Sequence, residues 1–117
     1  MPVTDIRAED LRELIKNKKD QLEIIDVREP DEFAIIHIKG SKMIPMNELQ
    51  ARISEIDWNK EVVFICRSGN RSKLMAMVVA AGEGKDIKNL EYGIYECFTS
   101  GKGENLEVDE NMIGRYF

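Results

Sequence analysis

Side chains that bind metals or form cross-links are scarce in this chain of 117 residues, which has two cysteines and one histidine. Two cysteines cannot build the framework of a small disulfide-rich protein. Cys66 and Cys97 lie far apart, and His37 is the sole imidazole, so the usual ligand spacing of a zinc site is missing and no metal site is predicted. Cys97 is interpreted as a structural residue, with a role as resolving thiol for Cys66 as the alternative.

The chain also has fewer basic than acidic residues. It contains 17 lysines and arginines and 22 acidic residues, which gives a net charge of −5. The one basic cluster, at residues 16–19, is interpreted as the cation-rich end of a helix, so no nucleic-acid partner is predicted. No apolar run approaches membrane length, and residues 1–20 show no charged-then-apolar signal. We therefore expect no membrane association and a reducing, cytoplasmic location. The sequence leaves the oligomeric state open.

Apolar runs and helical patterns alternate along the chain, which predicts one α/β domain over residues 1–117 with a mainly parallel sheet and helices on both faces. Residues 103–117 form a predicted C-terminal tail that follows a flexible glycine-containing joint. Its apolar end is expected to pack on the domain, with a dimer contact as the alternative. The predicted strands are 22–26, 43–45, 62–65 and 86–90, and the predicted helices are 8–18, 30–36, 49–56 (with Asn47 as N-cap), 71–81 and 93–100.

The most informative stretch is residues 61–81. Val62–Ile65 is a short, unbroken apolar run typical of a strand buried on both faces, and residues 74–81 form a helical run that is apolar nearly all round. That helix is expected to be buried from several sides, with Met75 and Met77 filling the core. Between strand and helix lies a polar loop with one thiol, and ligands bind at such strand-to-helix connections of open α/β sheets.

The loop is suited to hold an anion beside Cys66. A thiol reacts as its thiolate, which positive potential favours. Arg67 and Arg71 carry permanent charges with planar donor groups, the following helix directs its N-terminal N–H groups at the loop, and Gly69 permits backbone conformations in which successive N–H groups face inward. The alternative is that Cys66 is an ordinary buried residue at the end of a strand.

Four segments in order resemble the motifs of rhodanese sulfurtransferases, whose active-site loop has the pattern Cys-Arg-x-Gly-x-Arg/Thr-Ser. The matching loop here consists of Cys66, Arg67, Ser68, Gly69, Asn70, Arg71 and Ser72. The segments 25–33, 37–45 and 90–96 resemble the family's other elements. Departures from the family patterns fall outside the loop and are expected to affect substrate access and packing; they are Ile36, Met43, Tyr92 and Cys97.

The resemblance implies a rhodanese-like fold with about five strands and a thiosulfate sulfurtransferase activity that needs no cofactor. Cys66 would form a persulfide by attacking the outer sulfur of a donor such as thiosulfate, and would pass that sulfur to cyanide or to a small-molecule or protein thiol. The other loop residues are the expected binding site for the small anionic donor, through their N–H groups, guanidinium groups and hydroxyls; they are Arg67, Ser68, Gly69, Asn70, Arg71 and Ser72.

Two further readings stay open. A Cys-dependent phosphatase or arsenate reductase also places a cysteine beside an anion-binding loop, but the spacing here is Cys-x4-Arg, whereas such phosphatases resemble Cys-x5-Arg and usually have His where this chain has Ile65. A non-enzymatic persulfide carrier or regulatory protein-binding module would keep the same loop, so the loop residues do not separate it from an enzyme.

Support for the loop is expected from Asp26 and Arg28, because Asp26 ends a buried strand as Cys66 does, and parallel strands end at the same edge of a sheet. The alternative for Asp26 is a structural ion pair or a turn residue. His37 follows the short helix rather than lying beside Cys66 in the sequence, so it is assigned a structural hydrogen bond.

Overall fold

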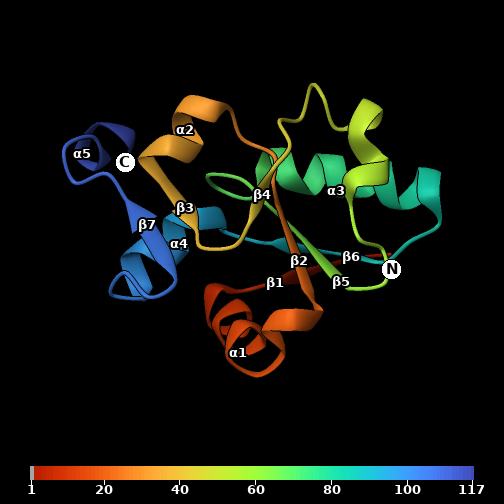
Figure 1. Cartoon of the computed structure of the whole chain (residues 1–117), viewed down its shortest axis with the longest axis horizontal. Helices are drawn as coiled ribbons and strands as arrows, with labels where there is room; N and C mark the ends of the chain where they lie inside the picture. The colour runs from red at the N-terminus through yellow and green to blue at the C-terminus, as the bar shows by residue number, and fades with distance from the viewer. Residues whose placement is uncertain (1) are drawn as a thin grey trace.

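The computed structural model describes residues 2–117, so Met1 of the predicted domain lies outside it. Its elements alternate as the sequence predicts (Figure 1). The strands are β1 (Val3–Ile6), β2 (Leu22–Asp26), β3 (Ile36–Ile38), β4 (Lys42–Met43), β5 (Glu61–Ile65), β6 (Ile87–Leu90) and β7 (Leu106–Val108). The helices are α1 (Ala8–Lys18), α2 (Pro30–Ile35), α3 (Asn70–Glu83), α4 (Gly93–Ser100) and α5 (Ile113–Tyr116), with short 3-10 turns at η1 (Lys19–Gln21) and η2 (Gln50–Glu55).

Five strands form one parallel sheet in the order β1-β6-β5-β2-β4, which confirms the predicted α/β class. The middle strands read as apolar runs because both their faces are covered. In β5, Val63 and Ile65 pack in the core on one face, and Val62 and Phe64 pack in the core on the other. This alternation places the backbone that follows Ile65 at the carboxyl edge of the sheet, where the predicted loop begins.

Helices lie on both sides of the sheet, with α1 on one side and α3 on the other (Figure 1). The α1 side also holds α4 and an antiparallel ribbon of β3 and β7, which the sequence analysis did not predict. The ribbon joins the first half of the chain to residues 106–108. Beyond it, Ile113, Tyr116 and Phe117 pack against the core on this side, so residues 103–117 are in contact with the rest of the chain.

Two local predictions are wrong. The segment expected to be a helix over 49–56 forms the η2 turn, and Leu49, rather than Asn47, precedes it. Helix α3 is not buried all round, because it packs on the sheet through Met75, Ala76, Val79 and Ala80, while Leu74, Met77 and Val78 are exposed. Met77 is therefore not a core residue. The helix also continues through Gly82 to Glu83, and Gly84, which follows it, has the left-handed conformation of a helix C-terminus.

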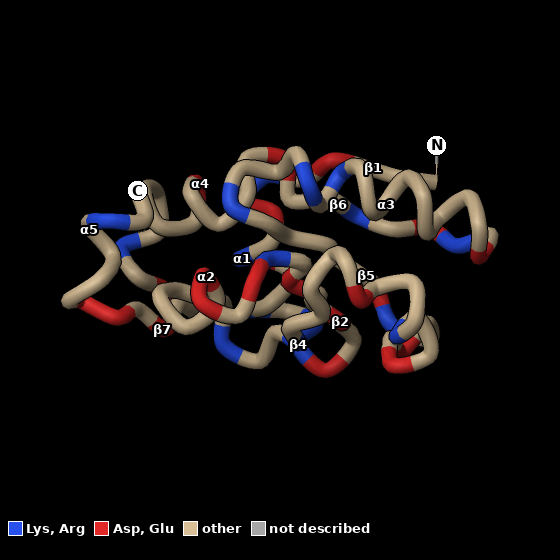
Figure 2. Tube along the Cα trace, turned by 90° about the horizontal axis from the view of Figure 1, so that it is seen from above, with Lys and Arg blue, Asp and Glu red and all other residues tan. Residues whose placement is uncertain are grey.

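Charged residues of both signs are mixed along the trace (Figure 2). Many of their side chains form ion pairs. The described residues include no helix that is long and apolar enough to cross a membrane. Within the same range, no group of three or more His, Cys, Asp or Glu side chains is arranged to hold a metal ion.

Candidate active site

The Cys66 sulfur lies inside a turn of backbone N–H groups at the start of α3. The N–H of Gly69 points to Cys66 Sγ at 3.1 Å, and the N–H of Ser72 points to it at 3.4 Å. Both donors belong to the N-terminal end of the helix, where N–H groups lack helical partners and the helix dipole is positive. The sulfur therefore lies where two backbone donors converge. The residue is buried, with 1% of its surface exposed, and belongs to the core cluster on the α3 side of the sheet.

Two glycines fix the path of this turn. Gly69 has φ of 96°, and a Cβ atom there would lie 1.9 Å from the carbonyl oxygen of Glu91. Gly93 has φ of 66°, and a Cβ atom there would lie 2.3 Å from the carbonyl oxygen of Arg67. The first turn of α4 therefore lies directly against the loop, and the N–H of Ile94 donates to the carbonyl of Cys66 at 2.9 Å. Only glycine fits both positions without moving the backbone.

The hydroxyl of Ser72 points into the sheet rather than toward the sulfur. It is fully buried and donates to Asn89 Oδ1 on β6 at 2.6 Å. The amide nitrogen of Asn89 in turn donates to Asp5 Oδ1 at 3.0 Å. This chain of hydrogen bonds links the first turn of α3 to β6 and β1, which holds the N–H of Ser72 in place below the sulfur.

Arg71 is held by a carboxylate from the short helix α2. Its two terminal nitrogens donate to Glu32 at 2.8 and 3.0 Å, which is the bidentate geometry of a strong ion pair. Glu32 also accepts hydrogen bonds from the N–H of Glu29 and from the hydroxyl of Tyr116. Burial opposes the ionisation of Glu32, but the bonds from Arg71, Tyr116 and Glu29 outweigh it and lower the pKa of this carboxyl to about 2.

Arg67 turns toward the C-terminal segment instead. Its Nε and Nη2 atoms donate to the carbonyl oxygen of Tyr116 at 3.3 and 3.1 Å. Its guanidinium carbon lies 5.4 Å from the ring centre of Tyr116 and 5.2 Å from that of Phe117. The two loop arginines therefore point to different partners, and Arg67 offers an anion fewer uncommitted donor groups than its charge alone suggests.

Asp26 and Arg28 form a fully buried ion pair at the end of β2, with Arg28 Nη2 donating to Asp26 Oδ2 at 2.7 Å. The pair connects to the loop in two ways. The N–H of Val27, which lies between them, donates to the carbonyl of Ile65, and Arg28 Nη1 donates to the Tyr116 hydroxyl at 3.1 Å. The pair is thus a structural ion pair that is linked to the loop through β5 and Tyr116, and its effect on activity stays a prediction.

The remaining residues of interest lie away from the sulfur. His37 Nδ1 is 2.9 Å from the carbonyl of Phe33, whose ring it stacks on, which is the structural hydrogen bond predicted for it. Cys97 is a buried free thiol in the core beside α1, and burial raises its pKa to about 11. Ser68 and Asn70 are exposed at the tip of the loop.

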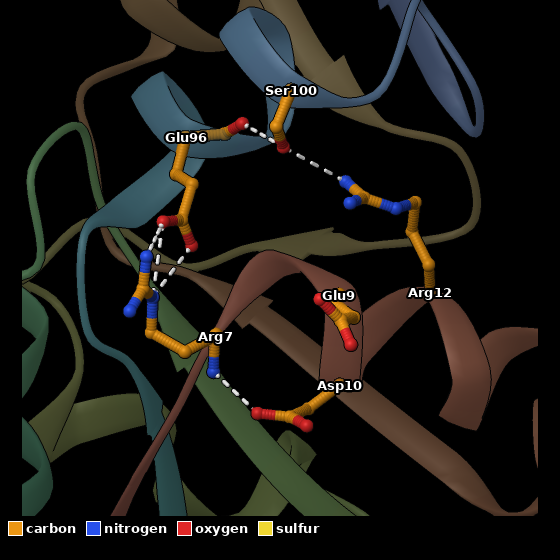
Figure 3. Close-up of a pocket in the computed structure, with 6 residues that line it drawn as sticks. All are labelled: Arg7, Glu9, Asp10, Arg12, Glu96 and Ser100. Atoms are coloured by element: carbon orange, nitrogen blue, oxygen red, sulfur yellow. Dashed lines mark hydrogen bonds and ion pairs between the residues drawn. The ribbon is translucent and has the colours of Figure 1, made fainter.

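A surface cavity of about 310 Å³ lies between α1 and α4, with Arg7, Glu9, Asp10, Arg12, Glu96 and Ser100 around it (Figure 3). Two of its carboxylates already have partners, because Arg7 binds Glu96 and the Arg7 N–H donates to Asp10. Arg12 donates to the Ser100 hydroxyl at 3.2 Å. None of the six lining side chains is a strong nucleophile, so this cavity is a weaker candidate for chemistry than the Cys66 loop.

The structure brings the loop residues, Asp26 and Arg28 to one edge of the sheet, and it adds four residues that the sequence analysis did not assign to the site: Glu32, Asn89, Tyr116 and Asp5. Two of these had a signal in the sequence. Glu32 lies within a segment that resembles a rhodanese motif, and Asn89 is a polar residue inside a predicted strand. Tyr116 had none, because its partners are far away in the chain.

Comparison with known proteins settles the family. The model of the rhodanese-like domain matches residues 7–98, which is most of the chain. The chain belongs to the rhodanese-like domain family. The matched range contains the Cys66 loop, Glu32 and the Asp26–Arg28 pair, and it ends before Tyr116.

Relatives of this rhodanese-like domain include named sulfurtransferases. A sulfurtransferase of Allochromatium vinosum is 36% identical over 93 residues, covering 79% of this chain and 85% of the relative. The thiosulfate:glutathione sulfurtransferase of Saccharomyces cerevisiae is 29% identical over 113 residues, covering 86% of this chain and 81% of the yeast protein. The candidate sulfur carrier protein YrkF of Bacillus subtilis is 36% identical over 95 residues, but the match covers 79% of this chain and only 50% of YrkF. The chain likewise spans 56% of a second Bacillus subtilis relative, YqhL.

Solved structures show the same fold. A rhodanese-related protein from Thermoplasma volcanium has a TM-score of 0.76 and 31% identity, covering 91% of this chain and 99% of the other. A rhodanese-like domain protein from Staphylococcus aureus has a TM-score of 0.77 and 26% identity, covering 92% of this chain and 99% of the other. The parallel five-stranded sheet described above is therefore a rhodanese-like fold.

Proposed function

We propose that this rhodanese-like domain transfers sulfane sulfur through a persulfide on Cys66, with thiosulfate as the donor. The Cys66 thiolate attacks the outer sulfur of thiosulfate, a new sulfur–sulfur bond forms, and the bond to the sulfonate sulfur breaks with release of sulfite. The acceptor, cyanide or a thiolate, then attacks the outer sulfur of the persulfide and regenerates the Cys66 thiolate. The electron pairs balance in both halves without a further oxidant or reductant.

The observation that supports this chemistry best is the pair of N–H groups directed at the Cys66 sulfur. The same donors can stabilise a thiolate before the reaction and a persulfide anion after it. Arg71 supplies a fixed positive charge beside them for the sulfonate oxygens of the donor. Glu32 occupies two of its N–H groups and leaves the others for a ligand, as far as residues 2–117 show.

Both cysteines are free thiols, as the reaction requires. A persulfide cycle needs Cys66 reduced, so a reducing compartment such as the cytoplasm suits the proposed activity. A thiol acceptor is consistent with the printed name of the yeast relative, a thiosulfate:glutathione sulfurtransferase.

Burial of the thiol favours a second candidate, a persulfide carrier. The residue that would carry the persulfide is only 1% exposed, so a carrier would keep its sulfur until a partner protein accepts it. The Bacillus subtilis relative YrkF has a name of this kind. The two candidates share the first half-reaction and differ in the second.

The experiment has two stages. Intact-mass measurement after incubation with thiosulfate should show a gain of about 32 Da, one sulfur atom, in the wild type and none in Cys66→Ser. Steady-state production of thiocyanate or glutathione persulfide then separates the candidates, since an enzyme turns over repeatedly and a carrier stops after one equivalent. A wild type that takes up no sulfur, or a Cys66→Ser variant that still does, contradicts both. An aryl phosphate, tested in parallel, should not be hydrolysed.

A further inference from the structure

Tyr116 lies outside the residues that the family model matches, yet it contacts more of the site than any other side chain in the C-terminal segment. It ends the short helix α5 and is half-buried against the core. Its position there is set by Phe117, Ile113 and the β3–β7 ribbon, which fold residues 106–117 back over the end of the sheet. This segment therefore brings to the loop a contact from outside the range that the family model matches.

The Tyr116 hydroxyl joins two charged groups. It donates to Glu32 Oε2 at 2.7 Å and accepts from Arg28 Nη1 at 3.1 Å. The same Glu32 oxygen accepts from Arg71 Nη2 at 3.0 Å. One continuous row of hydrogen bonds thus runs from the buried Asp26–Arg28 pair through Tyr116 and Glu32 to Arg71.

Orientation of Arg71 depends on this row. Glu32 sits on a helix of six residues near the surface, and a lone carboxylate on such a helix could rotate. Its two oxygens are instead fixed by bonds from Glu29 and Tyr116 in addition to those from Arg71. A carboxylate that is fixed in this way holds the planar guanidinium group of Arg71 in one orientation.

We propose that Tyr116 is a positioning residue for the sulfur donor, acting through Glu32 on Arg71. The inference rests on the proposed function, because it assigns Arg71 to the anionic donor. Different parts of Tyr116 have different contacts. The carbonyl and the ring hold Arg67, whereas the hydroxyl alone reaches Glu32.

Tyr116→Phe tests the hydroxyl alone, since it keeps the ring and the carbonyl. We expect the KM for thiosulfate to rise about fivefold, which is ~1 kcal/mol of lost donor binding, while kcat stays within about twofold and the KM for the acceptor is unchanged. Tyr95→Phe is the matched control, because Tyr95 is exposed and the variant removes only its hydroxyl while keeping the ring that contacts Phe117. Glu32→Gln should raise the KM for thiosulfate in the same way, since it keeps a side chain that Tyr116 can reach but removes the charge.

Calorimetric titration of thiosulfate into Cys66→Ser, with and without Tyr116→Phe, gives a readout that needs no sulfur transfer. We expect the double variant to bind about fivefold more weakly. Equal affinity in the two proteins, or a Tyr116→Phe enzyme that loses thermal stability and kcat while its KM for thiosulfate stays at the wild-type value, overturns the inference. If the wild type takes up no sulfur, the proposed function fails, and the titration alone then decides the role of Tyr116.

Discussion

The two cysteines of this rhodanese-like domain occupy regions that are alike in several respects. Cys66 and Cys97 are 1% and 6% exposed, and both are free. Each lies in a region with an arginine–glutamate pair. Arg71 pairs with Glu32 across from the loop of Cys66, and Arg7 pairs with Glu96, the residue before Cys97. Figure 3 shows the Arg7–Glu96 pair. Burial and a nearby ion pair therefore do not distinguish the two thiols.

The backbone does distinguish them. Cys66 follows a strand and has two N–H groups directed at its sulfur, whereas Cys97 lies within α4, where the N–H groups are used by the helix. Burial raises the pKa of Cys97 to about 11, so it stays a neutral thiol at physiological pH. The two thiols therefore differ in the backbone turn around Cys66, on which the proposed function depends, rather than in burial or in a nearby ion pair. The predictions that follow test this difference, beginning with the largest expected effect.

Replacing each thiol in turn tests the comparison directly. Cys66→Ser should abolish both the mass gain with thiosulfate and sulfur transfer, because the nucleophile is lost. Cys97→Ser should keep kcat within about twofold and lose about 1–2 kcal/mol of stability, since a buried sulfur is replaced by a hydroxyl. Mass spectrometry, initial rates and urea unfolding measure these outcomes. A large loss of transfer in a folded Cys97→Ser would make Cys97 a resolving thiol and remove the contrast.

The backbone turn itself is tested by Gly69→Ala, with Gly84→Ala as control. Both glycines have positive φ, but a Cβ atom at Gly69 would overlap the Glu91 carbonyl, whereas in the described part of the chain no non-neighbouring atom lies within 4 Å of one at Gly84. Gly84→Ala should cost about 1–2 kcal/mol for the conformation alone. Gly69→Ala should cost at least about 3 kcal/mol or displace the loop, with loss of sulfur transfer.

Urea unfolding and thiosulfate turnover measure both variants. Equal stability and full activity in Gly69→Ala would mean that the turn tolerates a different path, and that the two N–H contacts are not needed.

The arginines give the next test. Arg71→Ala should lower kcat/KM for thiosulfate about 30- to 100-fold, that is by about 2–3 kcal/mol, since it removes a fixed charge beside the donor site. Arg7→Ala, at the pair near Cys97, should leave kcat/KM within about twofold because Arg7 is largely exposed and away from the loop. Initial rates over a range of thiosulfate concentrations compare them. Similar losses in both variants would show that net charge, not position, sets donor binding.

Much of the fold could be predicted because its signals are local. Strand β5 reads as an apolar run since its side chains enter the cores on both faces, and α2 begins at Pro30, which suits the first position of a helix. The loop could be predicted for the same reason, because its cysteine, arginines and glycine are consecutive. Comparison with known proteins confirms the rhodanese-like assignment that these motifs indicated.

The rest depends on residues that meet only after folding. No local pattern shows that Tyr116 reaches Glu32, since the link requires the β3–β7 ribbon to return the chain across the sheet. The face of α3 was predicted wrongly because an apolar residue does not indicate whether a partner covers it. Leu74 and Met77 lie on the side of α3 that faces away from the sheet, and nothing among residues 2–117 covers them fully.

The smallest expected effect is the pH dependence of the free energy of unfolding that comes from Glu32 and Glu96. The pKa of Glu32 in the folded chain, about 2, lies below its ordinary value of 4.5. Its ionised form therefore stabilises the fold above about pH 4.5, and this contribution is lost as the pH falls toward 2. Allowing for partial exposure, Glu32→Gln should lower the free energy of unfolding at pH 7 by on the order of 2 kcal/mol, and the difference from wild type should shrink at pH 3.

The pKa of Glu96 is also lowered, by the hydrogen bond from Arg7, but Arg7 is exposed to solvent, so Glu96→Gln should show a smaller change of the same sign. Urea unfolding of the three proteins at pH 7 and pH 3 measures both differences. If the Glu32→Gln difference were the same at the two pH values, the ion pair with Arg71 would not be what holds this carboxylate ionised, and the closer coupling of Glu32 to the Cys66 loop would have no energetic basis.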